Sequence, residues 1–348
     1  MRHTLLNPAP SDALKRALER FESGFYFEAG NQLSDILAKE PGNTDAAFYY
    51  RLIERKFAKK EPRKATLVWQ FDPAQAWETD WLRLMLADSV AGEAFDNKWA
   101  HISDPMIVID NRLVPEKISY YREAFNKGVR IILVHLSDET FRDDLGAYKY
   151  CDAVIRNYHS ERLAAFSNIF TLPLGYKAGF TRGETPKPSS TRKYMWGFAG
   201  DSKKLTRAEM LAEMNKVPGG FTHLTSGFGA ADALSTADYR ALLDDSVFAP
   251  SPSGWSNIDS FRVYEALEAG CIPIVEQRPH FVYFTTLLGP HPIPTIENWA
   301  DAVSLIHKLN GANETERVRL ACANWWADYK PKLKTRLTDF ISRAFENP

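Results

Sequence analysis

Short apolar runs alternate with stretches of helical periodicity over most of the 348-residue chain. In the first half the runs are Thr66–Phe71, Met106–Ile109, Arg130–Leu136, Ala153–Ile155 and Ile169–Leu172; in the second they are Met195–Ala199, Phe221–Thr225, Val247–Ala249 and Cys271–Val275. Strands that alternate with helices are typical of parallel sheets with helical crossovers. The pattern therefore predicts an α/β protein with two such series.

The chain ends differ from this pattern. Apolar residues at helical spacing before Phe57, interrupted at Pro41-Gly42-Asn43, predict two or three antiparallel helices that resemble one tetratricopeptide-like hairpin. This extension could bind a partner or self-associate, but packing onto the next domain is favoured. Helical periodicity also runs from Glu314 to Phe345, with a break expected near Pro331.

These patterns divide the chain into four parts. We expect a helical extension over 1–62, a first α/β domain over 63–178, a second over 190–311 and C-terminal helices over 312–348. The polar residues 59–64 should form a joint, and the Gly, Pro and Ser residues of 176–192 indicate an interdomain linker.

Composition excludes some classes of protein. The net charge of −1 gives no basic field for nucleic acid. Three dispersed cysteines favour buried thiols over disulfides or a metal cluster. No apolar run reaches the roughly 18 residues of a membrane span, and the N-terminus does not resemble a secretion signal. We expect a cytoplasmic protein, with peripheral association at the inner membrane face as an alternative.

Candidate chemistry is concentrated in residues 246–276. An apolar run, the loop Pro250–Asn257, a helix ended by Gly270 and a second apolar run follow one another, and Asn257 or Asp259 could cap the helix. Such a loop and helix N-terminus after a parallel strand favour phosphate binding. Arg262 and Glu265 share a helix face and could meet a diphosphate and a ribose; the alternative is an ordinary surface ion pair.

The run SFRVYEALEAGCIPIV resembles the signature of exostosin-like glycosyltransferases, and GFAGDSKKLTRAEML resembles the opening of their donor-binding domain. The resemblance implies a GT-B fold, in which two Rossmann-like domains face across a cleft and the C-terminal helices could cross back to the first domain. It also implies inverting transfer from a nucleotide sugar without an essential metal or cofactor. UDP-sugars are the donors it favours. The donor-binding candidates are Gly200, Arg207, Ser253, Gly254, Ser256, Asn257, Arg262 and Glu265, with Lys203 or Lys204 as further candidates.

Inverting transfer also needs a base for the acceptor hydroxyl. Asp138 and Glu139 follow a predicted central strand of the first domain and are the catalytic candidates, because ligands bind beyond the carboxyl ends of parallel strands. The alternative is that Ser137 caps a helix with an acidic first turn. His135, Asp110 and Asp72 are reserves.

The sequence thus predicts a glycosyltransferase that acts on a nucleotide-sugar donor and a saccharide or other hydroxyl acceptor, in the synthesis of surface polysaccharide or glycoconjugates. Two alternatives stay open. A nucleotide-sugar epimerase or phosphorylase could use the same fold, and a non-catalytic protein could bind a ligand in the cleft and a partner through the N-terminal helices.

Overall fold

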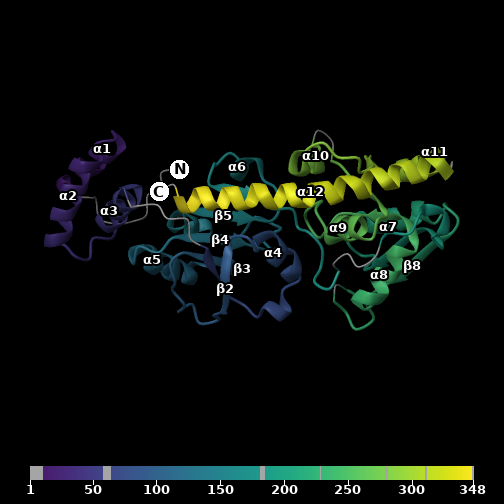
Figure 1. The fold of residues 1–348 in the computed structure, drawn as a ribbon, viewed down its shortest axis with the longest axis horizontal. Coiled ribbons are helices and arrows are strands. Elements are labelled where there is room, and N and C mark those ends of the chain that lie inside the picture. Colours follow the sequence, from purple (N-terminus) through teal and green to yellow (C-terminus); the bar gives the residue numbers. More distant parts are fainter. Residues whose placement is uncertain are drawn as a thin grey trace.

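The computed structural model describes residues 11–57, 64–180, 185–227, 229–278, 281–309 and 312–346. Of the predicted polar joint 59–64, only Lys64 falls within these ranges, and residues 181–184 of the predicted linker also lie outside them. Within them, the molecule is elongated and consists of a helical extension followed by two α/β units (Figure 1).

The N-terminal extension contains α1 (Asp12–Glu22), α2 (Tyr26–Lys39) and α3 (Thr44–Phe57). Apolar residues of all three helices, among them Leu14 and Leu33, form a small core of their own. Helix α3 also packs on α5 of the first α/β unit, where the Phe48 and Phe125 rings stack with centroids 5.1 Å apart. Three helices are therefore present, and the extension is packed onto the next unit as favoured.

The first α/β unit has a six-stranded sheet in the order β2-β1-β3-β4-β5-β6, with all neighbours parallel. Its strands are β1 (Ala65–Trp69), β2 (Val90–Phe95), β3 (Met106–Asp110), β4 (Ile131–His135), β5 (Ala153–Arg156) and β6 (Ile169–Thr171). Its helices are α4 (Thr79–Leu86), α5 (Ile118–Asn126) and α6 (Glu161–Ala164), with 3-10 turns η1 (Pro73–Gln75), η2 (Pro115–Lys117) and η3 (Leu145–Tyr150). Alternate residues of β3 enter the two cores on either face, as expected for a covered parallel sheet.

The second unit has a five-stranded parallel sheet in the order β11-β10-β9-β7-β8. Its strands are β7 (Tyr194–Gly200), β8 (Gly220–Leu224), β9 (Ser246–Ser251), β10 (Ile272–Glu276) and β11 (Thr295–Ile296). The other elements are the turn η4 (Ser189–Thr191) and helices α7 (Arg207–Met214), α8 (Thr236–Asp244), α9 (Phe261–Glu268), α10 (Tyr283–Leu288) and α11 (Trp299–Leu309). Strand β9 continues to Ser251, whereas the sequence predicted its end at Ala249. Its pairing with β7 ends at Phe248, so Pro250 interrupts no hydrogen-bond ladder on that side.

The C-terminal helix α12 (Ala312–Glu346) runs along both α/β units (Figure 1). Its Trp326 ring stacks on Trp81 of α4 with centroids 5.8 Å apart, and Trp326 Nε1 donates to Glu268 Oε1 of α9 at 2.8 Å. The predicted break near Pro331 is wrong, because the helix continues through this residue. Pro331 removes one backbone hydrogen bond, but Leu333 and residues around it remain buried against the units, which holds the helix together.

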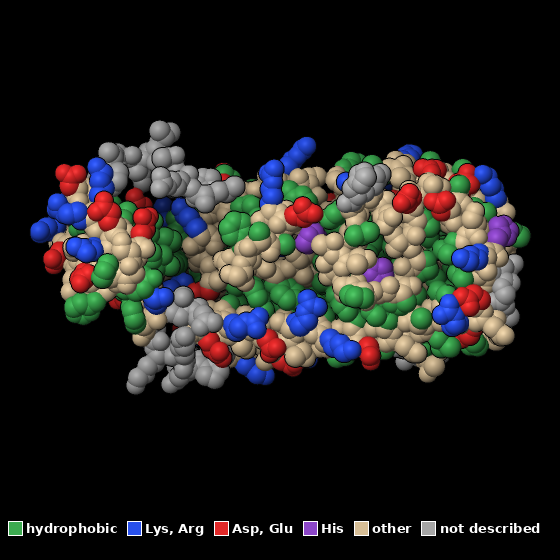
Figure 2. Space-filling model, turned by 90° about the horizontal axis from the view of Figure 1, so that it is seen from above, with side chains coloured by type: hydrophobic (Ala, Val, Ile, Leu, Met, Phe, Trp, Pro, Cys, Tyr) green, Lys and Arg blue, Asp and Glu red, His purple; other side chains and the backbone are tan. Residues whose placement is uncertain are grey.

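The face of the molecule shown in Figure 2 carries basic and acidic side chains mixed with one another, with apolar groups between them. This face has no large field of one sign, in agreement with the near-neutral net charge. No helix in the described ranges has both the length and the apolar character that crossing a bilayer requires. Cys151, Cys271 and Cys322 are buried free thiols, as the sequence predicted.

Candidate functional site

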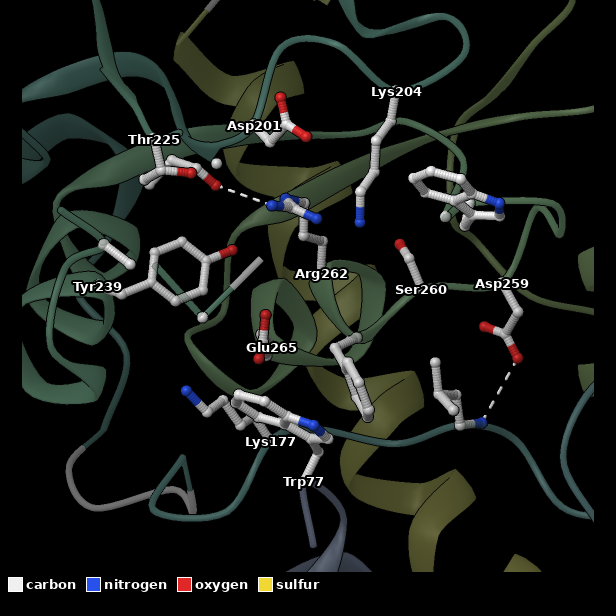
Figure 3. Close-up of a pocket in the computed structure, with 18 of the residues that line it drawn as sticks. Trp77, Lys177, Asp201, Lys204, Thr225, Tyr239, Asp259, Ser260, Arg262 and Glu265 are labelled. Atoms are coloured by element: carbon white, nitrogen blue, oxygen red, sulfur yellow. Dashed lines mark hydrogen bonds between the residues drawn. The ribbon is translucent and has the colours of Figure 1, made fainter. Parts of the chain in front are cut away.

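A cavity of about 370 Å³ lies between the two α/β units, where polar segments follow the carboxyl ends of their strands. The first unit contributes residues after β1, β4 and β5, and the second contributes residues after β7, β8 and β9 together with the first turn of α9. Figure 3 shows how several of these side chains converge on one space. Five of the eight donor-site candidates line it, namely Gly200, Arg207, Gly254, Arg262 and Glu265, whereas Ser253, Ser256 and Asn257 do not.

Three cations of the second unit share this cavity: Lys204, Arg207 and Arg262. Arg262 Nη2 donates to the carbonyl of Ala199, and Arg207 Nη1 donates to the carbonyl of Asp201, both at 2.9 Å. The Nε atoms of both arginines are buried without a hydrogen-bond partner. Neither guanidinium forms an ion pair with a carboxylate in the described part of the chain. Lys204 and Arg262 point into the same space (Figure 3).

Burial and mutual repulsion make these positive charges unfavourable in the unliganded protein. Burial, followed by the charge of Arg262, lowers the pKa of Arg207 to about 9. The pKa of Lys204 is also lowered, by burial and then by the two arginines. A different arginine in the same unit illustrates the contrast, because Arg192 donates to four backbone carbonyls. Arg192 is fully occupied by the fold, whereas Arg207 and Arg262 retain donors for an anion.

Helix α9 begins at Phe261, and its N-cap is Ser260 instead of the expected Asn257 or Asp259. Asn257 turns its side chain inward and accepts from the Asp259 N–H at 3.1 Å. The Ser260 hydroxyl is buried, has no hydrogen-bond partner and points into the cavity below Lys204 (Figure 3). The helix start therefore presents an unused hydroxyl and the positive end of its dipole beside the cations.

The loop before α9 differs from the expected phosphate cradle. The N–H groups of Ser256 and Asn257 donate to Glu139 Oε1 across the units, at 2.6 and 2.9 Å. The Ser253 hydroxyl donates to buried Glu276, which also accepts from Thr206 and Trp299. Two parts of the predicted site, the loop and a candidate base, are thus bound to each other.

Glu139 lines the main cavity and also a second cavity of about 410 Å³ on the other side of this contact. One of its two carboxylate oxygens is used by the loop.

The other base candidate, Asp138, does not line the main cavity. Its carboxylate is buried, contacts Arg156 Nη2 at 3.3 Å and accepts from the N–H of Arg142 at 2.8 Å. No helix follows, so the alternative of a Ser137 N-cap is wrong. Ser137 instead has a φ of 64°, and this left-handed conformation turns the chain after β4.

The reserve residues are occupied by local contacts. His135 contacts Tyr148 and Asp143, at 2.8 and 3.0 Å. Asp110 pairs with Lys117 at 2.7 Å, and Asp72 caps the turn η1.

Glu265 lies in the cavity, one turn after Arg262 on α9. The alternative of a surface ion pair is wrong, because Glu265 is buried and the two side chains do not form an ion pair in the described structure. Burial raises the pKa of Glu265 to about 7, against the opposing charge of Arg262 and the backbone N–H of Lys177. Tyr239, Lys177 and Trp77 surround this end of the cavity (Figure 3).

Sequence reasoning missed three further carboxyl groups that line the cavity, Glu78, Asp201 and Asp259. Burial raises the pKa of Glu78 and of Asp259 to about 7. Asp259 accepts from the Tyr264 hydroxyl at 2.8 Å and from the Leu174 N–H at 3.4 Å. Glu78 lies in the loop after β1, and its position beyond the carboxyl end of a parallel strand was the available clue.

The described residues contain no group of three or more His, Cys, Asp or Glu side chains arranged to hold a metal ion. The cavity has a cationic side, supplied by the second unit, and carboxyl groups from both units. Such an arrangement can bind a ligand that carries several negative charges and has a reactive centre beside them.

Comparisons with known proteins agree with this architecture. The family model of the RXYLT1 C-terminal domain matches residues 181–346, slightly less than half of the chain. No curated protein matches the sequence. The structure of an α1,3-fucosyltransferase has a TM-score of 0.55 at 11% identity, covering 84% of this chain and 93% of that one. The same enzyme with GDP-fucose has a TM-score of 0.51 at 12% identity and the same coverage.

The matched family model is not that of the exostosin-like enzymes, so that finer resemblance stays a prediction. The fold is settled by the two parallel sheets, the cavity between them and these structural neighbours. The chain has the GT-B fold, with two Rossmann-like units facing across a cleft and an N-terminal helical extension.

Proposed function

We propose that the protein transfers a sugar from a nucleotide-diphosphate donor to a hydroxyl acceptor. The observation that carries this proposal is the pair Arg207 and Arg262, two guanidinium groups in the cleft with unpartnered Nε atoms and no carboxylate partner in the described structure. The repulsion between these two buried cations lowers the stability of the folded protein, and a bound anion would neutralise it. A diphosphate suits three cations and the start of a helix.

The proposed reaction uses these cations directly. Negative charge grows on the diphosphate as its bond to the anomeric carbon breaks, and Lys204, Arg207 and Arg262 would stabilise that charge. The Ser260 hydroxyl would donate to a phosphate oxygen, and Glu265 would accept from a ribose hydroxyl. We propose inverting transfer that needs no metal or other cofactor, because the cations already face the leaving group.

The donor base and the cellular role are extensions of this proposal. UDP-sugars are favoured by the exostosin-like resemblance, whereas the fucosyltransferase neighbours are described with GDP and GDP-fucose. We propose a role in surface polysaccharide or glycoconjugate synthesis in the cytoplasm, with a saccharide or other hydroxyl acceptor. The N-terminal helices would serve for a protein partner or self-association.

A binding test followed by a turnover test addresses the proposal. Thermal melting of the wild-type protein with UDP, GDP and other nucleoside diphosphates should reveal one that stabilises it, because ligand binding to the folded state raises the melting temperature. Release of that nucleotide from candidate sugar donors then measures turnover. Donor isomerisation or phosphorolysis without transfer would indicate an epimerase or phosphorylase, and binding without turnover would indicate a binding protein.

Arg262→Met tests the site itself. This variant should have an affinity for the nucleotide that is at least about tenfold lower, since hydrogen bonds to charged groups contribute about 1.5–3 kcal/mol each. The nucleotide should therefore raise its melting temperature less than that of the wild-type protein. The matched control is Arg317→Met, because Arg317 is an exposed arginine of α12 that pairs with Glu314 away from the cavity. Equal nucleotide responses in both variants would contradict the site assignment.

A further inference from the structure

We infer that Glu78 is the catalytic residue that takes the proton from the acceptor hydroxyl, an inference that rests on the proposed glycosyl transfer. Glu78 is 5% exposed and lines the cavity. It belongs to the first α/β unit, whereas the cations proposed to hold the diphosphate belong to the second. A base on the opposite wall of the cleft would hold the acceptor hydroxyl on the side of the anomeric carbon away from the leaving group, which is the side of attack that inversion requires.

The backbone around Glu78 is fixed on both sides. The Trp77 carbonyl accepts from the Ala178 N–H at 2.7 Å, and the Thr79 hydroxyl donates to the Pro73 carbonyl at 2.7 Å. Glu78 is the N-cap residue of α4, but its side chain does not cap the helix. The turn that carries Glu78 is therefore rigid, and the Glu78 carboxyl group does not cap the helix that follows. A catalytic group needs such a fixed backbone and a side chain that the fold does not occupy.

The other carboxyl groups that line the cavity have partners. Glu139 is bound by two N–H groups of the loop before α9, and Asp259 by Tyr264 and Leu174. Asp201 accepts from the Lys203 N–H at 2.8 Å, and Glu265 is stabilised by Arg262 and the Lys177 N–H.

Burial raises the pKa of Glu78, and its own backbone N–H, which donates to the carboxylate, partly opposes that rise. Among the described residues no other group donates to this carboxylate. Apart from this one hydrogen bond, the oxygens of Glu78 are left to accept from a substrate.

The proposed step is balanced without any further reactant. The acceptor O–H bond breaks and its proton goes to a carboxylate oxygen of Glu78, while the oxygen forms a bond to the anomeric carbon. The bond between that carbon and the diphosphate oxygen breaks, and its electron pair leaves on the diphosphate beside Arg207 and Arg262. Glu78 then returns the proton to solvent.

The step requires ionised Glu78, so its pH dependence follows from the environment of this group. Burial raises the pKa of Glu78 to about 7, and transfer should therefore fall as the pH decreases through about 7. The titratable and charged groups that share the cavity are Glu139, Tyr158, Lys177, Asp201, Lys204, Arg207, Tyr239, Asp259, Arg262 and Glu265. Because Asp259 and Glu265 also have a pKa of about 7, the acid limb must be assigned with variants.

The test compares Glu78→Gln with the wild-type protein, using water and azide as acceptors and release of the nucleotide as the readout. Azide is an anionic nucleophile that needs no base; it attacks the anomeric carbon and the nucleoside diphosphate leaves. Glu78→Gln should bind the nucleoside diphosphate within about threefold of wild type but release it from the donor about 10²–10⁴-fold more slowly with water. Azide should restore most of this loss. Arg262→Met, which lacks a leaving-group contact, should not be rescued.

Two comparisons separate this role from a structural one. Glu78→Asp should retain an acid limb in its pH profile at a reduced rate, whereas Glu78→Gln should lose the limb; Asp259→Asn should keep it. Water-dependent release by Glu78→Gln within threefold of wild type, or a slow variant that azide does not rescue, overturns the assignment of Glu78. A wild-type protein that neither binds a nucleoside diphosphate nor releases one from any sugar donor overturns the proposed function as well.

Discussion

Replacing Arg207 by Met should stabilise the unliganded protein and weaken its nucleotide binding at the same time. Arg207 is 3% exposed, shares the cavity with Arg262 and donates one hydrogen bond, to the Asp201 carbonyl. Methionine matches the unbranched arginine side chain as far as about its Nε position, is a good helix former and carries no charge to bury. A variant that is more stable but binds the nucleotide more weakly would identify Arg207 as a residue that serves ligand binding and does not stabilise the fold.

The magnitude follows from the pKa. Burial and the charge of Arg262 lower the pKa of Arg207 from its ordinary value to about 9, which disfavours the charged form in the folded protein by an amount on the order of 5 kcal/mol, at about 1.4 kcal/mol for each tenfold change. The sign is unambiguous at neutral pH, since the guanidinium is charged in both the folded and unfolded states and the whole penalty opposes folding. The lost hydrogen bond and imperfect packing of Met offset part of it, so we expect a gain of about 1–3 kcal/mol.

Thermal melting with and without the nucleoside diphosphate measures both effects. A gain of 1 kcal/mol raises the melting temperature by about 2–4 °C for domains of 150–250 residues, so Arg207→Met should melt several degrees higher. At a ligand concentration of about 100 Kd the wild-type protein gains about 2.7 kcal/mol. A variant with 10- to 150-fold weaker affinity gains only about 0.3–1.4 kcal/mol at that concentration.

Arg192→Lys is the matched control, because Arg192 is a buried arginine of the same unit whose guanidinium is used by four carbonyls. Lysine keeps the charge but loses the planar fork, so this variant should melt lower and keep the nucleotide response. An Arg207→Met protein that melts lower than wild type and responds normally to the nucleotide would refute the reasoning.

Three further substitutions test particular contacts. Gly200→Ala should reduce nucleotide affinity at least about tenfold, because Gly200 has a φ of 149° and an added Cβ would lie 2.2 Å from Arg262 Nη2; titration calorimetry measures the loss. Gly175→Ala should destabilise the protein by about 3 kcal/mol or more in urea unfolding, because its Cβ would lie 2.3 Å from the Trp81 ring at a φ of 73°. Glu276→Gln should lower the melting temperature by several degrees and weaken nucleotide binding, because it removes one acceptor oxygen from three hydrogen bonds behind the loop before α9.

Most of the fold could be predicted because its strands are apolar on both faces. Strand β4 (Ile131–His135) is buried throughout and stands out as an apolar run, and the same holds for β3. Strand β2 was missed because it is an edge strand whose residues Val90–Phe95 are mostly exposed and contain Gly92. The two-residue strand β11 is too short to give a pattern.

The candidate site was only partly predictable. The sequence motif placed Arg262 and Glu265 on one helix face, which is a local property of a 3.6-residue period. The contact of Glu139 with the Ser256 and Asn257 N–H groups joins residues 117 and 118 positions apart, and no local pattern encodes it. Glu78 was missed because the local sequence after β1 does not show that this polar residue is buried beside the cavity.

The position of one unit against the other therefore determines whether the proposed site works. All the proposed donor contacts, the three cations, Ser260 and Glu265, belong to the second unit, whereas Glu78 belongs to the first. Their relative position depends on α12, whose Trp326 stacks on Trp81, and on the Glu139 contact across the cleft. If the proposed function holds, a change that loosens α12 should lower the rate of transfer more than the affinity for the nucleotide, because only the rate requires both units in register.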